Sequence, residues 1–213
     1  MAYKVKPQNF TSPRGELEWV TIEGEGKENL SGKMQYVANL VVDADDDIVA
    51  KIEKFWNENK PPKFKKEAKS NGLYSHTTDS GKVDEDGKKI YEPDGKLYLA
   101  FKTGVTFADG KTKKVQVHNA KGAKVELPEG TNIGNGSIGK ISGAMGIYTS
   151  ESKTGTILDA GVTLYLNAIQ IIKLEEFSQD AGFGEEEGGD FTGESDFEGV
   201  EETEAPATGT PRL

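Results

Sequence analysis

Two segments of the chain combine lysines with aromatic residues. Residues 51–69 carry seven lysines, three glutamates and three aromatic residues, and residues 96–124 carry seven lysines, a single acid and three aromatic residues. Lysine ammonium groups neutralise phosphates, and flat rings stack on unpaired bases at about 1–3 kcal/mol per base. The pattern indicates a surface that follows a single-stranded nucleic acid, although lysines also decorate ordinary solvated faces.

A glycine-rich segment, residues 137–148, offers a second candidate surface. As a strand, it would place Lys140 and Tyr148 on one face and Ile141 and Met145 on the other. Glycines inside a strand mark a bend or a place where a ligand approaches the backbone. The sequence leaves both interpretations open.

Residues 134–140 imitate a nucleotide-binding loop. They satisfy the GxGxxG spacing and the GxxxxGK part of a P-loop, but Ile141 stands where a P-loop needs Ser or Thr for magnesium. Both motifs also need a helix after the loop, and Gly143 and Gly146 disfavour one. Binding of ATP or NAD is therefore not expected.

Cysteine and histidine, which often form catalytic and metal sites, are absent and scarce, respectively. The chain has no cysteine, and its only histidines, His76 and His118, are far apart in the sequence. Residues 84–87 resemble the middle of a calcium loop, but Lys82 and Pro93 occupy the positions of the first and last ligands. We expect no metal, no cofactor and no enzymatic activity.

Charge divides the chain into two parts. The net charge is −10, but the residues from 175 to the end hold thirteen acids and one base, while residues 1–174 hold 25 bases and 23 acids. Aliphatic residues almost vanish after residue 178, so this segment cannot bury enough apolar area to offset its ordering entropy. We expect a folded domain over residues 1–177 and a disordered acidic tail over residues 178–213.

The tail combines acids with aromatic residues. This composition predicts partner-binding positions at Glu185, Glu186, Glu187, Phe191 and Phe197. A tethered polyanion has a local concentration of order millimolar, so it can occupy a basic groove that lacks nucleic acid, and it can also present acids to basic partners. Acidic runs also simply keep proteins in solution, and that alternative stays open.

The elements that must position the basic and aromatic residues are mostly strands. Apolar and alternating patterns predict the strands 16–22, 36–42, 97–102, 114–118, 137–148 and 156–174. One helix is expected to begin at Asp45–Asp47 and to end before Pro61. Residues 63–95 are expected to form loops or short hairpins, and the last strand is expected to contain a bend or bulge.

Five or six strands with one helix predict an all-β barrel of the OB type, a five-stranded Greek-key barrel. A β-sandwich is the alternative, since strand spacing does not separate the two. No apolar run approaches the roughly 18 residues of a membrane span, and the first residues lack the apolar segment of a secretory signal. We expect a cytoplasmic protein.

The order of these parts resembles the single-stranded-DNA-binding proteins of T-seven-like and related phages. The resemblance covers roughly residues 30–177 and rests on the segments 32–36, 98–102, 134–137, 140–148, 162–166 and 174–177, followed directly by the acidic tail.

The resemblance implies an OB-fold that coats single-stranded DNA in phage replication, recombination and repair in the host cytoplasm, without catalysis. It implies DNA contacts near Lys33, Lys140 and Tyr148, and a tail that docks replication proteins such as polymerase and helicase-primase. Combined with the basic and aromatic pattern, it predicts DNA-binding positions at Lys33, Tyr36, Trp56, Tyr98, Lys102, Lys140 and Tyr148. A protein-interaction or structural β-domain of a phage and an RNA-binding OB protein remain alternatives, and a homodimer is left open.

Overall fold

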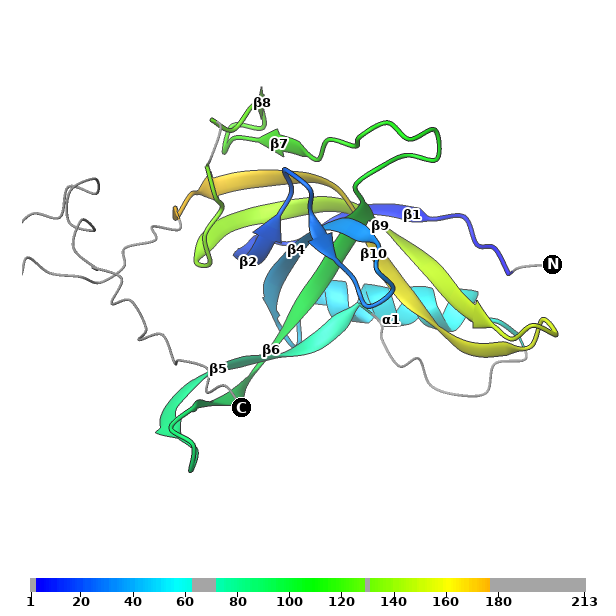
Figure 1. The fold of residues 1–213 in the computed structure, drawn as a ribbon, viewed down its shortest axis with the longest axis horizontal. Helices are drawn as coiled ribbons and strands as arrows, with labels where there is room; N and C mark the ends of the chain where they lie inside the picture. Colours follow the sequence, from blue (N-terminus) through cyan, green and yellow to red (C-terminus); the bar gives the residue numbers. More distant parts are fainter. Residues whose placement is uncertain (1–2, 63–71, 129–130, 177–213) are drawn as a thin grey trace, which may run out of the picture. The chain divides into compact units, whose positions relative to one another are not determined.

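The computed structural model describes residues 3–62, 72–128 and 131–176. The elements in this part of the chain, shown in Figure 1, are β1 (Gln8–Thr11), β2 (Gly15–Thr21), β3 (Lys27–Glu28), β4 (Met34–Asp43), α1 (Asp47–Asn59), β5 (Leu73–Val83), β6 (Lys89–Gly104), β7 (Gln116–His118), β8 (Lys124–Val125), β9 (Ser137–Glu151) and β10 (Ile157–Lys173).

Five of the strands form a closed ring. Strand β2 pairs with β4, β4 with β6, β6 with β10, β10 with β9, and β9 again with β2. The β6–β10 pairing is parallel, with Leu164 opposite Phe101, and the other four pairings are antiparallel. Closure leaves no open edge among these five strands, so the predicted OB-type barrel is confirmed.

The barrel is filled by alternate residues of its long strands. On β6, Leu99 and Phe101 are buried, while Tyr98 and Lys102 lie on the outer face, as the alternation predicts. Apolar residues of this kind from every strand of the ring build the core: Leu17, Tyr36, Ala38, Leu40, Val42, Leu99, Phe101, Ile141, Met145, Val162, Leu164 and Leu166.

The helix α1 begins and ends as predicted. Asp46 is its N-cap, and its carboxylate accepts a hydrogen bond from the Ile48 backbone N–H at 2.9 Å. Residues at helical spacing, among them Ile52 and Phe55, bury one face of the helix in the barrel core. No helix in the described part of the chain is long and apolar enough to cross a membrane.

The described part of the segment 63–95, residues 72–95, differs from the prediction of loops or short hairpins. Residues 73–104 form one long hairpin, β5–β6, which projects from the barrel in Figure 1. Its turn lies at Asp84–Lys88, where the Gly87 N–H donates to the Asp84 carbonyl. The Asp94–Gly95 dipeptide is a bulge inside β6, with Gly95 at φ +85°, because one residue of β5 faces three of β6 there. The predicted turn therefore does not end the strand.

Strands β9 and β10 bend around the barrel with the help of glycines and bulges. A Cβ on Gly143 would lie 2.3 Å from the Tyr165 carbonyl oxygen, so only glycine fits there. The register shift between Leu166 and Ala168 confirms the bulge predicted in the last strand. Strand β9 also starts at Ser137, where a P-loop would need a helix.

Candidate nucleic-acid interface

Two hollows on the outer face of β4, β6 and β10 share Gln35 and Lys102 and form one continuous surface. We call it the outer-face groove. Its lining residues are Trp19, Glu25, Lys27, Glu28, Asn29, Lys33, Met34, Gln35, Val37, Asn39, Tyr74, Tyr98, Ala100, Phe101, Lys102, Thr103, Gly104, Val105, Thr106, Lys113, Thr163 and Tyr165.

Lys102 lies at the centre of the outer-face groove. The register of β6 places it opposite Val37 of β4 on one side and opposite Tyr165 of β10 on the other. Its side chain is exposed, since it belongs to the outward set of the β6 alternation. Any ligand that runs along the groove therefore passes this ammonium group.

The outer-face groove carries more positive than negative charge. Four lysines and two glutamates line it: Lys27, Lys33, Lys102, Lys113, Glu25 and Glu28. Among the described residues, none of these four lysines forms an ion pair with a carboxylate. Their ammonium charges are consequently available to an anionic ligand.

Aromatic rings accompany these lysines. Tyr74 of β5 and Tyr98 of β6 are cross-strand partners whose rings stack at 5.2 Å between centroids. Burial raises the pKa of Tyr98, and the neighbouring Tyr74 and Glu18 raise it further. Tyr165 lies over Gly146, because a Cβ at that glycine would meet its ring at 2.6 Å. These rings give the groove flat apolar surfaces beside its cations.

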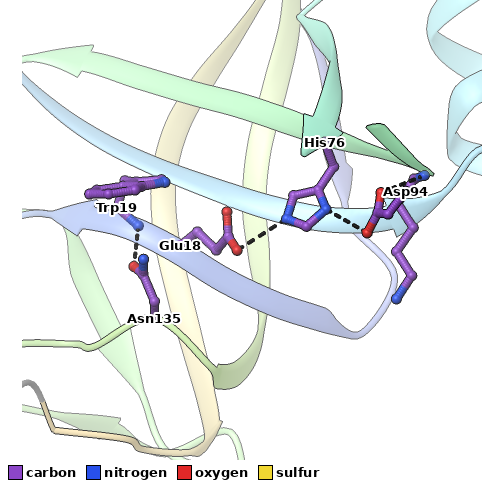
Figure 2. Close-up of polar contacts among 6 residues, drawn as sticks. Glu18, Trp19, His76, Asp94 and Asn135 are labelled. Carbon is purple, nitrogen blue, oxygen red and sulfur yellow. Dashed lines mark hydrogen bonds and ion pairs between the residues drawn. The ribbon is translucent and has the colours of Figure 1, made fainter. Parts of the chain in front are cut away.

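Trp19 adds an exposed ring at one end of the groove. Its side chain is 63% exposed, and its backbone adopts φ +51°, a left-handed conformation that costs a non-glycine residue about 1–2 kcal/mol. An extra residue in β2 between Glu18 and Thr21 causes this bulge. The Trp19 N–H donates to the Asn135 side-chain oxygen at 2.8 Å, as Figure 2 shows.

A buried histidine links the bulge of β2 to the β5–β6 hairpin. The His76 ring contacts Asp94 through Nδ1 at 2.8 Å and Glu18 through Nε2 at 3.2 Å (Figure 2). Burial lowers the pKa of His76, but the hydrogen bonds to Asp94 and Glu18 raise it more, so the net pKa lies above its usual value. A doubly protonated ring donates to both carboxylates and leaves the cluster with one net negative charge.

Comparison with known proteins supports the architecture. No protein-family model matches the sequence, and no curated protein matches it. The crystal structure of gp2.5, a single-stranded DNA-binding protein encoded by bacteriophage T7, aligns with a TM-score of 0.52 and 23% identity, over 95% of this chain and 100% of that chain. The chain shares the fold of gp2.5. A single-stranded DNA-binding protein of bacteriophage Enc34, in complex with single-stranded DNA, aligns with a TM-score of 0.49 and 16% identity, over 80% of this chain and 89% of that chain.

Within this gp2.5-like barrel, three predicted DNA-binding residues come together. Lys33, Tyr98 and Lys102 all line the outer-face groove. Tyr148 is half-buried on β9, and its pKa is raised by burial first and then by Asp159 and Tyr74. It lies opposite Gly161 of β10 and is not among the residues that line the outer-face groove.

Lys140 lies elsewhere on the gp2.5-like barrel. It lines a separate hollow together with His118, Ser142 and Gln170. The His118 ring contacts the Gly122 carbonyl oxygen of its own hairpin at 3.0 Å. The structure therefore does not bring Lys140 together with the three residues of the outer-face groove.

The predicted DNA-binding positions Tyr36 and Trp56 need exposed rings, but the structure buries both. Tyr36 is 3% exposed, because it shares the inward face of β4 with Ala38, and its hydroxyl donates to the Gly24 carbonyl at 3.1 Å. Burial, and secondarily Glu23, raises its pKa. Trp56 is 6% exposed on the apolar face of α1. A ring enclosed by the core presents no face to a base, so both leave the candidate interface.

The sequence prediction missed several residues of the groove, including Trp19, Lys27 and Tyr74, whereas Lys113 belongs to the basic segment 96–124. The predicted positions also omit Tyr165 of β10. The tail positions Glu185, Glu186, Glu187, Phe191 and Phe197 lie outside the described residues.

Proposed function

We propose that the protein binds single-stranded DNA without sequence preference and without catalysis. The observation that carries this proposal is the outer-face groove, where four lysines and a stacked tyrosine pair line one surface of an OB-type barrel. T7 gp2.5, which has the same fold, is a single-stranded DNA-binding protein. The likeness of fold supports the proposal, and the chemistry of the groove supports it independently.

In the proposed mode of binding, the lysines contact the phosphates and the rings contact the bases. Lys102 lies at the centre of the groove, Lys33 and Lys113 lie toward one end, and Lys27 lies toward the other. Together these four lysines neutralise successive phosphates. Exposed ring surface in the groove stacks on bases, and stacking tolerates any sequence because every base has a π-face. We assign Tyr148 and Lys140 to the flanks of this path.

The proposed preference is for a single strand over a duplex. In a duplex the bases stack on one another, so their faces are closed to protein rings, and only the phosphates remain for the lysines. An unpaired strand satisfies both kinds of group in the groove. The 2′-hydroxyl distinguishes RNA from DNA, so RNA binding is the nearest alternative.

We also propose a role for the acidic tail, residues 178–213. The residues from 175 to the end hold thirteen acids and one base, so the tail resembles a nucleic acid in charge. We infer that it competes with DNA for the lysines of the folded domain, residues 1–177, and docks phage replication proteins such as polymerase and helicase-primase. The biological setting would be phage replication, recombination and repair in the host cytoplasm.

Fluorescence anisotropy tests the proposal with three labelled ligands of equal length: a single DNA strand, a DNA duplex and an RNA strand. The proposal predicts the tightest binding to the single DNA strand at equal salt. Tighter binding to RNA would favour the RNA-binding alternative. No binding to any of the three at low salt would favour a structural or protein-interaction domain.

A further inference from the structure

Trp19 combines exposure with a fixed backbone. Its ring is 63% exposed although it belongs to a strand of the closed barrel. Leu17, two residues earlier in the same strand, faces the core and is fully buried. The bulge in β2 therefore turns Trp19 out of the position that simple alternation would give it.

Contacts on both sides of the bulge hold this conformation. Asn135, in the loop before β9, accepts a hydrogen bond from the Trp19 N–H, and Glu18 is fixed by the buried His76 of β5 (Figure 2). A bulky residue persists in the left-handed region only where its surroundings impose it. Two different parts of the fold hold it here, and such maintained strain is typical of functional sites.

The ring lies in a setting that suits a base attached to phosphates. Trp19 lines the same hollow as the Tyr98 ring, and Lys27 and Lys102 line it as well. Indole offers a large flat face, and aromatic stacking on a base is independent of sequence. The lysines select for a ligand that carries negative charge as well as flat rings.

The carboxylate next to Trp19 would repel phosphates if it were uncompensated. Glu18 instead accepts a hydrogen bond from the His76 ring at 3.2 Å, and its side chain is only 17% exposed. His76 is thus a positioning residue, since its ring fixes the carboxylate of the residue before Trp19.

We propose that Trp19 is a stacking platform for one base of the bound single strand, displayed by the left-handed bulge of β2. The inference rests on the proposed function and extends it. It assigns Trp19, next to Tyr98 at one end of the groove, as the residue where the strand enters or leaves. The base stacked on Trp19 and the base next to Tyr98 would share one hollow.

Tryptophan fluorescence tests the proposal directly, because the chain has two tryptophans and the other, Trp56, is buried. A dT oligonucleotide of about 20 nucleotides, longer than the usual site of one OB-fold, is titrated into the full-length protein. Wild type and Trp56→Phe should show quenching that follows binding, and Trp19→Phe should bind with little quenching. Quenching that persists in Trp19→Phe would overturn the proposal.

Affinity gives the second readout. Trp19→Ala should weaken oligonucleotide binding about 5- to 150-fold, the range that base stacking of about 1–3 kcal/mol gives. Trp19→Gly should weaken it equally while keeping the left-handed backbone without strain, so it decides the matter if the alanine variant unfolds. The control is Tyr91→Ala, which removes a ring of similar exposure on the β5–β6 hairpin, outside the outer-face groove.

The outcomes separate the two proposals. Wild-type affinity in both Trp19→Ala and Trp19→Gly, with oligonucleotide binding intact, would overturn the role of Trp19 and leave the proposed function in place. Failure of the wild-type protein to bind the oligonucleotide would overturn the proposed function itself. An equal loss in Tyr91→Ala would show that the effect is not specific to Trp19.

Discussion

Removal of the central ammonium group by Lys102→Ala should change the salt dependence of DNA binding by a calculable amount. Four lysines line the outer-face groove. If each contacts one phosphate, log K should fall with log salt at a slope of about −2.8, since a single strand contributes about −0.7 per contact. Between about 50 and 200 mM salt the wild-type affinity should then fall about 50-fold. The variant has three contacts, so its slope should be about −2.1 and its loss about 20-fold.

The assay is anisotropy of a labelled single strand at several salt concentrations, with Lys88→Ala as the matched control. Lys88 is a strongly exposed lysine in the turn of the β5–β6 hairpin, away from the outer-face groove. The control should keep the wild-type slope. A slope of wild-type steepness in Lys102→Ala would refute the assignment of a phosphate to Lys102, and a flat wild-type line would refute electrostatic binding altogether.

Three further perturbations have defined outcomes. Gly143→Ala should lower the unfolding free energy by about 1–3 kcal/mol in urea denaturation, because its Cβ would press on the Tyr165 carbonyl and on Phe101; unchanged stability would contradict this packing. The raised pKa of His76 means that its contribution to stability is complete below about pH 6.5 and is lost as pH rises through the folded pKa. His76→Gln should therefore flatten the decline of unfolding free energy above about pH 6.5. An unaltered pH profile would contradict the stabilising role of the contacts of His76 with Glu18 and Asp94. Deletion of residues 178–213 should tighten binding to a single strand and remove docking of replication proteins, whereas weaker DNA binding would contradict competition by the tail.

Most strands of the barrel and its helix could be predicted from the sequence, because the patterns that specify strands and helices extend over only a few residues. Alternation in residues 97–102 predicted which side chains of β6 face the core, and Asp46 with Pro61 marked the two ends of the helix. The fold class followed from the number of strands and the position of the helix.

The candidate site was less predictable because it depends on burial and on contacts far apart in sequence. The aromatic signal at Tyr36 and Trp56 indicated stacking, but both rings are needed to fill the core. Trp19 gave no sequence signal, since its exposure results from a bulge held by Asn135, 116 residues away. Local composition cannot show which of several rings the fold leaves uncovered.

The long β5–β6 hairpin shows the same limit. Asp94–Gly95 is a typical turn dipeptide, yet it forms a bulge inside β6, because His76 of the facing strand binds the Asp94 carboxylate. The backbone N–H of Lys96 and the His76 ring both lower the pKa of that carboxyl, because both interactions favour its ionised form. A contact between strands thus decides a conformation that the dipeptide alone leaves open.

Photocrosslinking tests the central claim most directly, namely that the outer-face groove is the path of the strand. A single DNA strand carrying 5-iodouracil is bound to the full-length protein, irradiated and mapped by mass spectrometry. The account predicts crosslinks at the rings of the groove, foremost Trp19 and Tyr98. Crosslinks confined to rings away from the groove, such as Tyr91 on the β5–β6 hairpin, would contradict it.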